Sequence, residues 1–384
     1  MGATLAEQIE HAYALDRERK PQAVGPDDIP VSYEAITDAW LTAILCAGVP
    51  GAAVLGHRLE APDSGTSNRR RIHLSYNDAG VAAGLPASVF CKATFELANR
   101  MILGHSGGIH SEVTFYKRAR PLLDIEAPRC FYAAYDPHSF ASLVMLADLG
   151  EEVHFCNHDT PVDRARIESQ LDLLASLHSR FFQSPLLDTD LGPLFTWHQR
   201  FHNLERFKLR ECCEQGVLDA ESIIPARLFA RRDEIWPRTL DSVERHLSLP
   251  HSLTHGDVHL KNWYITGDGA MGLGDWQVTS KGHWSRDFAY TISTALKPAD
   301  RRAWERELLA YYLERLAAAG GERINLDAAM VHYRQQLLSA LAWWTLTLAP
   351  ASDMPDMQPR ETSITFIRRI AQAIDDLDAL DSFK

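Results

Sequence analysis

Two kinds of hydrophobic pattern divide the chain. In the first part, apolar and polar residues alternate over short runs, separated by turn-forming residues at 63–68 and 84–86. This pattern is typical of an antiparallel meander. In the second part, apolar residues recur three, four and seven positions apart, which predicts amphipathic helices. The predicted strands are residues 53–56, 71–76, 88–92, 129–135 and 142–147, and the predicted helices of the second part are residues 163–182, 299–319, 325–349 and 361–380.

The order of these elements predicts an α+β fold with two lobes. A small lobe, residues 1–146, would hold the N-terminal helices and an antiparallel sheet, and a larger lobe, residues 147–384, would be mostly helical. Within the small lobe, Ser32 is expected to cap a helix that runs through Ile36 to Leu45.

Composition narrows the classes of partner. The 384 residues carry a formal net charge of -12, which argues against nucleic acid or an anionic membrane as the main partner. The charge still allows a nucleotide, because one lysine and one metal ion can make a local positive site. No apolar run approaches the ~20 residues that span a bilayer, and the N-terminus lacks the pattern of a signal peptide. The six cysteines are scattered without a CxxC pair, which predicts reduced thiols in a cytoplasmic protein.

The densest cluster of reactive side chains is the sequence HGDVHLKN at residues 255–262. Two strand-like runs follow it and are joined by a Gly-Asp-Gly turn, which predicts a β-hairpin that ends at Asp275. Asn262 and Asp275 would then meet at the open end of the hairpin, with Asp257 a short loop upstream. Carboxylate and carboxamide oxygens are the ligands that suit Mg²⁺.

This set of side chains fits phosphoryl transfer to a hydroxyl group. In that reaction one aspartate accepts the substrate proton, while an asparagine and a second aspartate hold the metal ions that bridge the phosphates. The spacing HxDxxxxN, followed by an aspartate at the end of a hairpin, is typical of kinases, with Gly256 where protein kinases usually have arginine.

Residues upstream of the cluster meet the further demands of a kinase. Lys92 ends an apolar strand, where its amine can reach phosphates, and Glu112 on the next helix could pair with it. The turn residues Ser64, Gly65 and Thr66 could contact phosphate through backbone N–H groups and hydroxyls. This turn has a lone glycine and no GxGxxG pattern, so a simple connection between strands accounts for it equally well.

With these motifs, the sequence resembles the aminoglycoside phosphotransferase and choline-kinase-like superfamily, whose fold is related to that of protein kinases. The motifs that carry the resemblance are residues 255–262 and 274–277, supported by 85–92 and 112–116, and the resemblance spans roughly residues 32–300. The helical opening at Trp40-Leu41-Thr42 and Gln277 after Asp275-Trp276 look closest to the ecdysteroid-kinase-like branch.

The resemblance implies an ATP- and Mg²⁺-dependent small-molecule kinase. Asp257 would be the catalytic base, Asn262 and Asp275 the Mg²⁺ ligands, and Lys92 the phosphate-holding lysine paired with Glu112. The small lobe would bind the nucleotide, and the larger lobe would carry the catalytic loop and the substrate site.

The resemblance also implies roles for residues around this centre. The segment at 143–149 looks like the connection between the lobes, where backbone groups of Ala147 and Leu149 would meet adenine. Asp287 resembles an aspartate that supports the catalytic loop, although an ordinary helix cap would explain it as well. His255 is expected to hold the backbone of the loop through a ring N–H, and the role of His259 stays open.

Two other functions remain open on the sequence. His255, Asp257 and His259 could be HxDxH ligands of a metal-dependent hydrolase, but such a site would need more clustered histidines, and only His251 lies close by. A catalytically silent binding module on a kinase fold is the other alternative. Such a module usually lacks the base or a metal ligand, and here all are present.

The acceptor is expected to be a small molecule with a hydroxyl group. An aromatic and basic stretch follows the metal-ligand motif, and it favours an uncharged or weakly polar alcohol over a polycation. The tryptophans of this set could equally belong to the core of helices. The candidate substrate residues are Trp276, His283, Trp284, Tyr333 and Trp343. The sequence gives no oligomeric state.

Overall fold

Packing contacts divide the protein into two units. The computed structural model describes residues 3–150, 152–352, 354 and 357–383, and for Ser64 the backbone alone. The first unit comprises Met1–Lys117 and Pro128–Gly150, and the second comprises Arg118–Ala127 and Glu151–Lys384. Residues 147–150 therefore lie with the sheet, and residues 118–127 lie with the helical unit.

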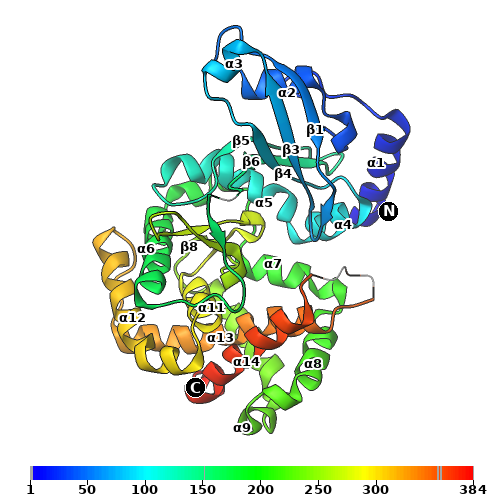
Figure 1. Ribbon diagram of the computed structural model, residues 1–384. Coiled ribbons are helices and arrows are strands. Elements are labelled where there is room, and N and C mark those ends of the chain that lie inside the picture. Colours follow the sequence, from blue (N-terminus) through cyan, green and yellow to red (C-terminus); the bar gives the residue numbers. More distant parts are fainter. Residues whose placement is uncertain (1–2, 151, 353, 355–356, 384) are drawn as a thin grey trace. The chain divides into compact units, whose positions relative to one another are not determined.

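The first unit is built around an antiparallel sheet in the order β1-β3-β4-β6-β5, with the short β2 paired to β3 (Figure 1). All five predicted strands are present. In β4, Val89 and Cys91 place alternate side chains in the interior, whereas the central strand β6 is buried on both faces from Ser142 to Leu146. The strands are β1 (Val54–Leu59), β2 (Asp63–Ser64), β3 (Asn68–Tyr76), β4 (Ser88–Ala93), β5 (Cys130–Tyr135) and β6 (Ser142–Ala147).

Helices surround this sheet in the first unit. The buried Trp40 of α2 (Asp38–Leu45) belongs to the same apolar core as Ile72 and Met145 of the sheet. The helix that carries Glu112 ends at Thr114, and the chain continues as a π-helical turn over Phe115–Ala119. The remaining helices are α1 (Leu5–Arg19), α3 (Asp78–Ala82), α4 (Leu97–Ser106) and α5 (Gly108–Thr114).

The helix expected from Ser32 to Leu45 is in fact two elements. Ser32 caps a single 3-10 turn over Tyr33–Ala35, and Ile36 is extended. Thr37 then caps α2 by accepting the amide of Trp40, and its hydroxyl also donates to the carbonyl of Ala23 at 2.6 Å. The Thr37 hydroxyl competes with helix continuation by bonding backbone groups. One of these groups, the carbonyl of Ala23, is distant in sequence, so the break was not predicted.

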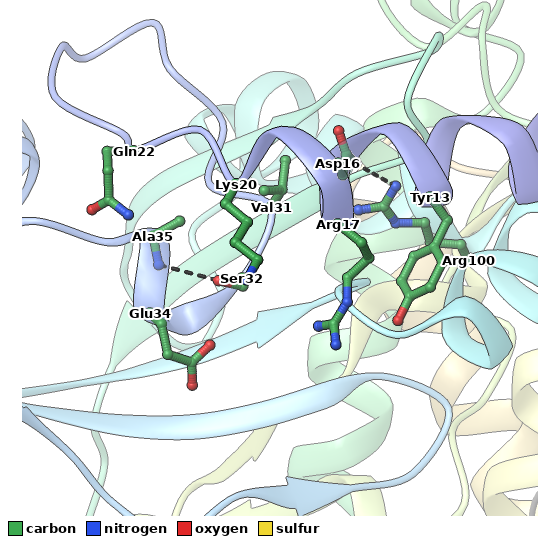
Figure 2. A pocket seen from close by; sticks show the side chains of 10 residues that line it. All are labelled: Tyr13, Asp16, Arg17, Lys20, Gln22, Val31, Ser32, Glu34, Ala35 and Arg100. Carbon is green, nitrogen blue, oxygen red and sulfur yellow. Dashed lines mark hydrogen bonds and ion pairs between the residues drawn. The ribbon is translucent and has the colours of Figure 1, made fainter.

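A pocket of about 260 Å³ opens in the first unit between α1 and the turn that follows Ser32 (Figure 2). Arg100 lies fully buried at one end, and its guanidinium donates to Asp16 at 2.6 Å. Arg17 and Lys20 of α1 line the same pocket. None of the site residues predicted from the sequence lines it.

The second unit is mainly helical, and its described residues also form two small sheets, one of three strands (β10-β9-β7) and one of two (β11-β8). The predicted helices after residue 160 are all present, within a few residues of their expected ends. One apolar core joins α7, α8, α10 and α13 around Trp197 and Trp236. The helices are α6 (Arg164–Phe181), α7 (Trp197–Asn203), α8 (Leu209–Asp219), α9 (Ala226–Phe229), α10 (Arg232–Glu244), α11 (Ser285–Ala295), α12 (Pro298–Ala318), α13 (Leu326–Leu348) and α14 (Arg360–Asp376). The strands are β7 (His154–Phe155), β8 (Ser252–Thr254), β9 (Trp263–Ile265), β10 (Met271–Leu273) and β11 (Ser280–Gly282).

Together the two units give the predicted α+β fold class, with a small antiparallel sheet unit and a larger helical unit. In the described part of the chain, no helix is both long and apolar enough to cross a membrane. All six cysteines are free thiols.

Candidate active site

The HGDVHLKN loop follows strand β8. Its second residue, Gly256, has a backbone conformation that favours glycine. Gly256 has φ +82°, and a Cβ there would lie 2.6 Å from the carbonyl oxygen of Val278. Any larger residue would have to move the backbone of the neighbouring turn. This contact explains why glycine stands at the position where protein kinases have arginine.

The predicted hairpin is formed by β9 and β10, with Met271 opposite Ile265 and Leu273 opposite Trp263. At its open end, the amide of Gly274 donates to the carbonyl of Asn262 at 2.9 Å. The next residue, Asp275, has the left-handed backbone conformation, with φ 58°. Non-glycine residues rarely adopt this conformation, and such positions concentrate at functional sites.

The carboxylate of Asp257 is held by three side chains. The hydroxyl of Tyr290 donates to Oδ1 at 3.1 Å, while Nδ2 of Asn262 lies 3.3 Å and Nε2 of His259 lies 3.5 Å from Oδ2. Burial raises the pKa of Asp257, but the nearby His259, His255 and Arg286 outweigh this effect, and the pKa falls to about 2. Asp257 is therefore ionised and fixed in orientation.

Asn262 also forms a hydrogen bond to the backbone within the same loop. Its Nδ2 donates to the carbonyl oxygen of Asp257 at 2.7 Å. The carboxamide oxygen of Asn262 accepts no hydrogen bond from the described residues. Because the nitrogen is engaged, this oxygen is the atom that the side chain can offer to a ligand.

Two further residues hold the backbone of the loop. Asp287, which is fully buried on α11, accepts the amides of His255 and Gly256 at 2.7 and 2.9 Å. The amide of Asp257 donates to Nδ1 of His255 at 3.1 Å, so Nε2 of His255 carries the proton and donates to the carbonyl of Gly274 at 2.9 Å. These contacts are those of loop-supporting residues.

Sequence reasoning missed three side chains around this loop. His178 of α6 contacts Asp287 through Nε2 at 3.1 Å, and Arg286 donates to the carbonyl of Gly256 at 2.7 Å. The third is Tyr290, which lies three residues after Asp287 on α11 and thus on the same helix face. This spacing was a usable signal for Tyr290, whereas α6 is too distant in sequence to predict His178.

In the first unit, Lys92 and Glu112 form the expected pair. Nζ of Lys92 lies 2.8 Å from Oε1 of Glu112, and both side chains are only 7% exposed. β4 presents the lysine and α5 presents the glutamate. A buried pair of this kind holds the ammonium group in one place.

The turn after β2 is fixed by protein contacts. Nδ2 of Asn99 donates to the carbonyls of Gly65 and Thr66 at 2.9 Å each, and the amide of Gly65 donates to the carbonyl of Ser67. The side chain of Ser64 lies outside the described part of the structure. Phosphate contact by this turn stays a prediction.

The segment after β6 is anchored by Asp148. Its carboxylate accepts two hydrogen bonds from Arg71 and one from the Ser88 hydroxyl. The amide of Ala147 donates to the carbonyl of Arg129 at 2.7 Å, so this N–H is already used in a backbone hydrogen bond next to the sheet. The expected adenine contact at Ala147 cannot use that amide, and contact at Leu149 stays a prediction.

Most of the predicted substrate residues are buried, which corrects that part of the sequence analysis. Trp276 donates to the carbonyl of Leu273, and His283 and Trp284 both contact Glu322. Tyr333 donates to Glu305. Trp276, His283, Trp284 and Tyr333 are at most 1% exposed and have no surface for a substrate, whereas Trp343 is half-buried and stacks on Phe201.

The HxDxH residues do not form a metal site. Both ring nitrogens of His255 already have protein partners, so this side chain has no lone pair to give to a metal ion. Among the described residues, the one cluster with metal-ligand spacing lies elsewhere, at His198, His202 and Glu244.

Comparisons with known proteins identify the family of the chain. The sequence profile of the phosphotransferase enzyme family matches residues 102–332, which is more than half of the chain and includes Glu112, Asp257, Asn262 and Asp275. No curated protein matches the chain in sequence. The match does not distinguish the ecdysteroid-kinase-like branch, which stays a prediction.

Among solved structures at low sequence identity, one with a TM-score above 0.5 shows the same fold. An inferred aminoglycoside phosphotransferase of Ralstonia eutropha is 14% identical with a TM-score of 0.51, over 88% of this chain and 96% of its own. An ethanolamine kinase of Plasmodium vivax is 11% identical with a TM-score of 0.49, over 99% and 97%. A choline kinase of Streptococcus pneumoniae is 11% identical with a TM-score of 0.45, over 84% and 94%. By its sequence profile and its loop geometry, the chain belongs to the phosphotransferase enzyme family.

Proposed function

We propose that the protein transfers the γ-phosphoryl group of ATP, with Mg²⁺, to a hydroxyl group of a small molecule. One observation carries the proposal: an ionised Asp257 is held in a fixed orientation beside Asn262, and the hairpin brings Asp275 to the same end of the loop. A carboxylate, a carboxamide and a second carboxylate in this order are the groups that phosphoryl transfer to an alcohol requires.

Asp257 would orient the acceptor hydroxyl and take its proton. A carboxylate whose pKa is about 2 is a weak base toward a ground-state alcohol. The transition state of phosphoryl transfer is loose in most analyses, so the hydroxyl becomes acidic late in the reaction. The main demand on Asp257 is then a fixed position, and its contacts with Tyr290 and Asn262 supply it.

Asn262 and Asp275 fit Mg²⁺. The nitrogen of Asn262 is tied to the loop, which leaves its oxygen for a ligand, and Asp275 contributes a half-buried carboxylate. Hard oxygen donors in small number are what Mg²⁺ takes from proteins. When bound, Mg²⁺ would neutralise charge on the phosphates. In the first unit, the ammonium group of Lys92 would contribute a fixed positive charge for binding nucleotide phosphate.

The acceptor remains the open part of the proposal. The expectation of an uncharged or weakly polar alcohol depended on aromatic residues that are now known to be buried, and only the half-buried Trp343 still supports it. A screen for acceptors should therefore include neutral alcohols, sugars and amino alcohols.

Two measurements test the function. ATP with Mg²⁺ should raise the melting temperature, because a ligand that binds only the folded state stabilises it. In the presence of an acceptor, ADP should form in proportion to the phosphorylated product. If millimolar ATP leaves the melting temperature unchanged with and without Mg²⁺, and no acceptor yields ADP, the proposal is wrong.

A further inference from the structure

A second cluster of chemically reactive side chains lies in the second unit, on residues that phosphoryl transfer does not use. Among the described residues, His198, His202 and Glu244 are the one group whose ligand atoms all lie within 4.8 Å of each other. The two histidines are four residues apart on α7, which places them on one face of the helix. Glu244 is the last residue of α10.

The three side chains point at a common position. Nε2 of His198 and Nε2 of His202 each lie 3.0 Å from the same atom, Oε1 of Glu244. The centroids of the two rings are 4.4 Å apart. Two imidazole nitrogens and a carboxylate oxygen that converge in this way form one of the donor sets of protein zinc sites.

The second nitrogen of His202 strengthens this interpretation. Nδ1 lies 2.7 Å from Oε1 of Glu205. With a metal ion at Nε2, His202 is neutral and donates Nδ1–H to Glu205, as metal-bound histidines usually donate to a carboxylate outside the ligand set.

We propose that His198, His202 and Glu244 bind one divalent transition-metal ion of the zinc class, with Glu205 orienting His202. Two ligand atoms bonded to zinc at about 2.1 Å in tetrahedral geometry are about 3.4 Å apart. The observed 3.0 Å from each histidine nitrogen to Oε1 of Glu244 differs from this separation by only a few tenths of an ångström. The side chains of His198, His202 and Glu244 are 24, 31 and 49% exposed, so an ion and a fourth, water ligand can enter from solvent.

The metal ion would strengthen the contact between α7 and α10 at the partly exposed side chains of His198, His202 and Glu244. The buried face of α7 carries Trp197. The centroid of its ring lies 3.5 Å from Cζ of Arg286. Arg286 in turn donates to the carbonyl of Gly256 in the HGD loop. The metal site would therefore stabilise α7, the helix that contacts the HGD loop through Trp197 and Arg286.

Zinc titration of the full chain tests this proposal directly. The protein is prepared without a polyhistidine tag, freed of metal with a chelator, and titrated with Zn²⁺ in a calorimeter in the absence of nucleotide. We expect one Zn²⁺ per chain, and with Co²⁺ the visible absorption of a tetrahedral site. The variants His198→Gln and His202→Gln should each weaken binding by about a hundredfold, and Glu205→Gln by about tenfold.

Matched controls separate this site from others. His138→Gln removes an exposed histidine of the first unit and should leave Zn²⁺ binding unchanged. Asp257→Asn should also leave it unchanged, and loss of binding in that variant would place the metal at the HxDxH loop and overturn the proposal. Failure of the wild-type chain to bind Zn²⁺ saturably, or full binding by folded His198→Gln and His202→Gln chains, would overturn it as well.

Discussion

The hydroxyl of Tyr290 donates a hydrogen bond to Oδ1 of Asp257 at 3.1 Å, and the two residues come from different parts of the fold. Asp257 lies in the loop after β8, and Tyr290 lies on the fully buried α11. Burial raises the pKa of Tyr290 well above its ordinary value, so the phenol stays neutral and remains a donor. Tyr290 is therefore a positioning residue for the proposed base.

Replacing Tyr290 by phenylalanine should lower turnover while nucleotide binding persists. A hydrogen bond to a charged group contributes about 1.5–3 kcal/mol, so a loss of tenfold or more in kcat is expected. The affinity for ATP with Mg²⁺ should change little, because Tyr290 contacts the carboxylate of Asp257 and neither predicted metal ligand. Steady-state kinetics with any accepted alcohol gives both values.

Tyr264→Phe is the matched control for this variant. The hydroxyl of Tyr264 donates to Glu126 at 2.8 Å within the same unit. The substitution therefore also removes a tyrosine hydroxyl, but one that does not contact Asp257. Equal losses of kcat in the two variants would mean that Tyr290 acts only through stability.

Asp257→Asn should reduce turnover by about 10²–10⁴-fold, which is the usual contribution of a general base. Asparagine preserves the size of the side chain and removes the proton acceptor. ATP and Mg²⁺ should still bind with near wild-type affinity, because the proposal places Asp257 at the acceptor hydroxyl. A comparable loss of metal–nucleotide affinity, measured by calorimetry, would instead assign Asp257 to the metal.

The acid stability of the protein should depend on Asp257. Its folded pKa of about 2 is below the ordinary 3.8, so its contribution to the free energy of unfolding is present above about pH 4 and is lost as the pH falls toward 2. The shift corresponds to about 2 kcal/mol. Urea unfolding at several pH values should therefore show a shallower acid decline for Asp257→Asn than for wild type. The exposed Asp190→Asn serves as control, and an equally shallow decline in that variant would contradict the assignment.

Local signals account for the parts of the site that the sequence predicted. The hairpin of β9 and β10 follows from a Gly-Asp-Gly turn between two apolar runs, and its register places Asn262 near Gly274. Long-range packing accounts for the parts that it did not. Trp284 looked available for a substrate because nothing in its neighbourhood reveals that Glu322 accepts its ring N–H. Likewise, Tyr290 reaches Asp257 only because α11 packs beneath the loop.

Asp275→Asn should raise the Mg²⁺ concentration required for half-maximal turnover, by about tenfold or more. Asparagine suits this test better than alanine, because the backbone at Asp275 is left-handed and asparagine tolerates that conformation. The substitution thus removes a charge and leaves the fold. Asp268→Asn, in the exposed turn of the same hairpin, should leave the Mg²⁺ requirement unchanged. Unchanged Mg²⁺ dependence of Asp275→Asn would remove this residue from the metal site.

The buried pair of Lys92 and Glu112 should have separable effects on stability and on nucleotide binding. Lys92→Met leaves the Glu112 carboxylate buried without its lysine, and breaking such a pair typically destabilises a protein by about 3–5 kcal/mol. The double variant Lys92→Met/Glu112→Gln removes both charges and should recover much of that loss in urea unfolding. Both variants should bind ATP more weakly than wild type, because neither has the ammonium group proposed to hold the phosphates. If the double variant is stable and binds ATP as tightly as wild type, the pair is purely structural and Lys92 has no role at the phosphates.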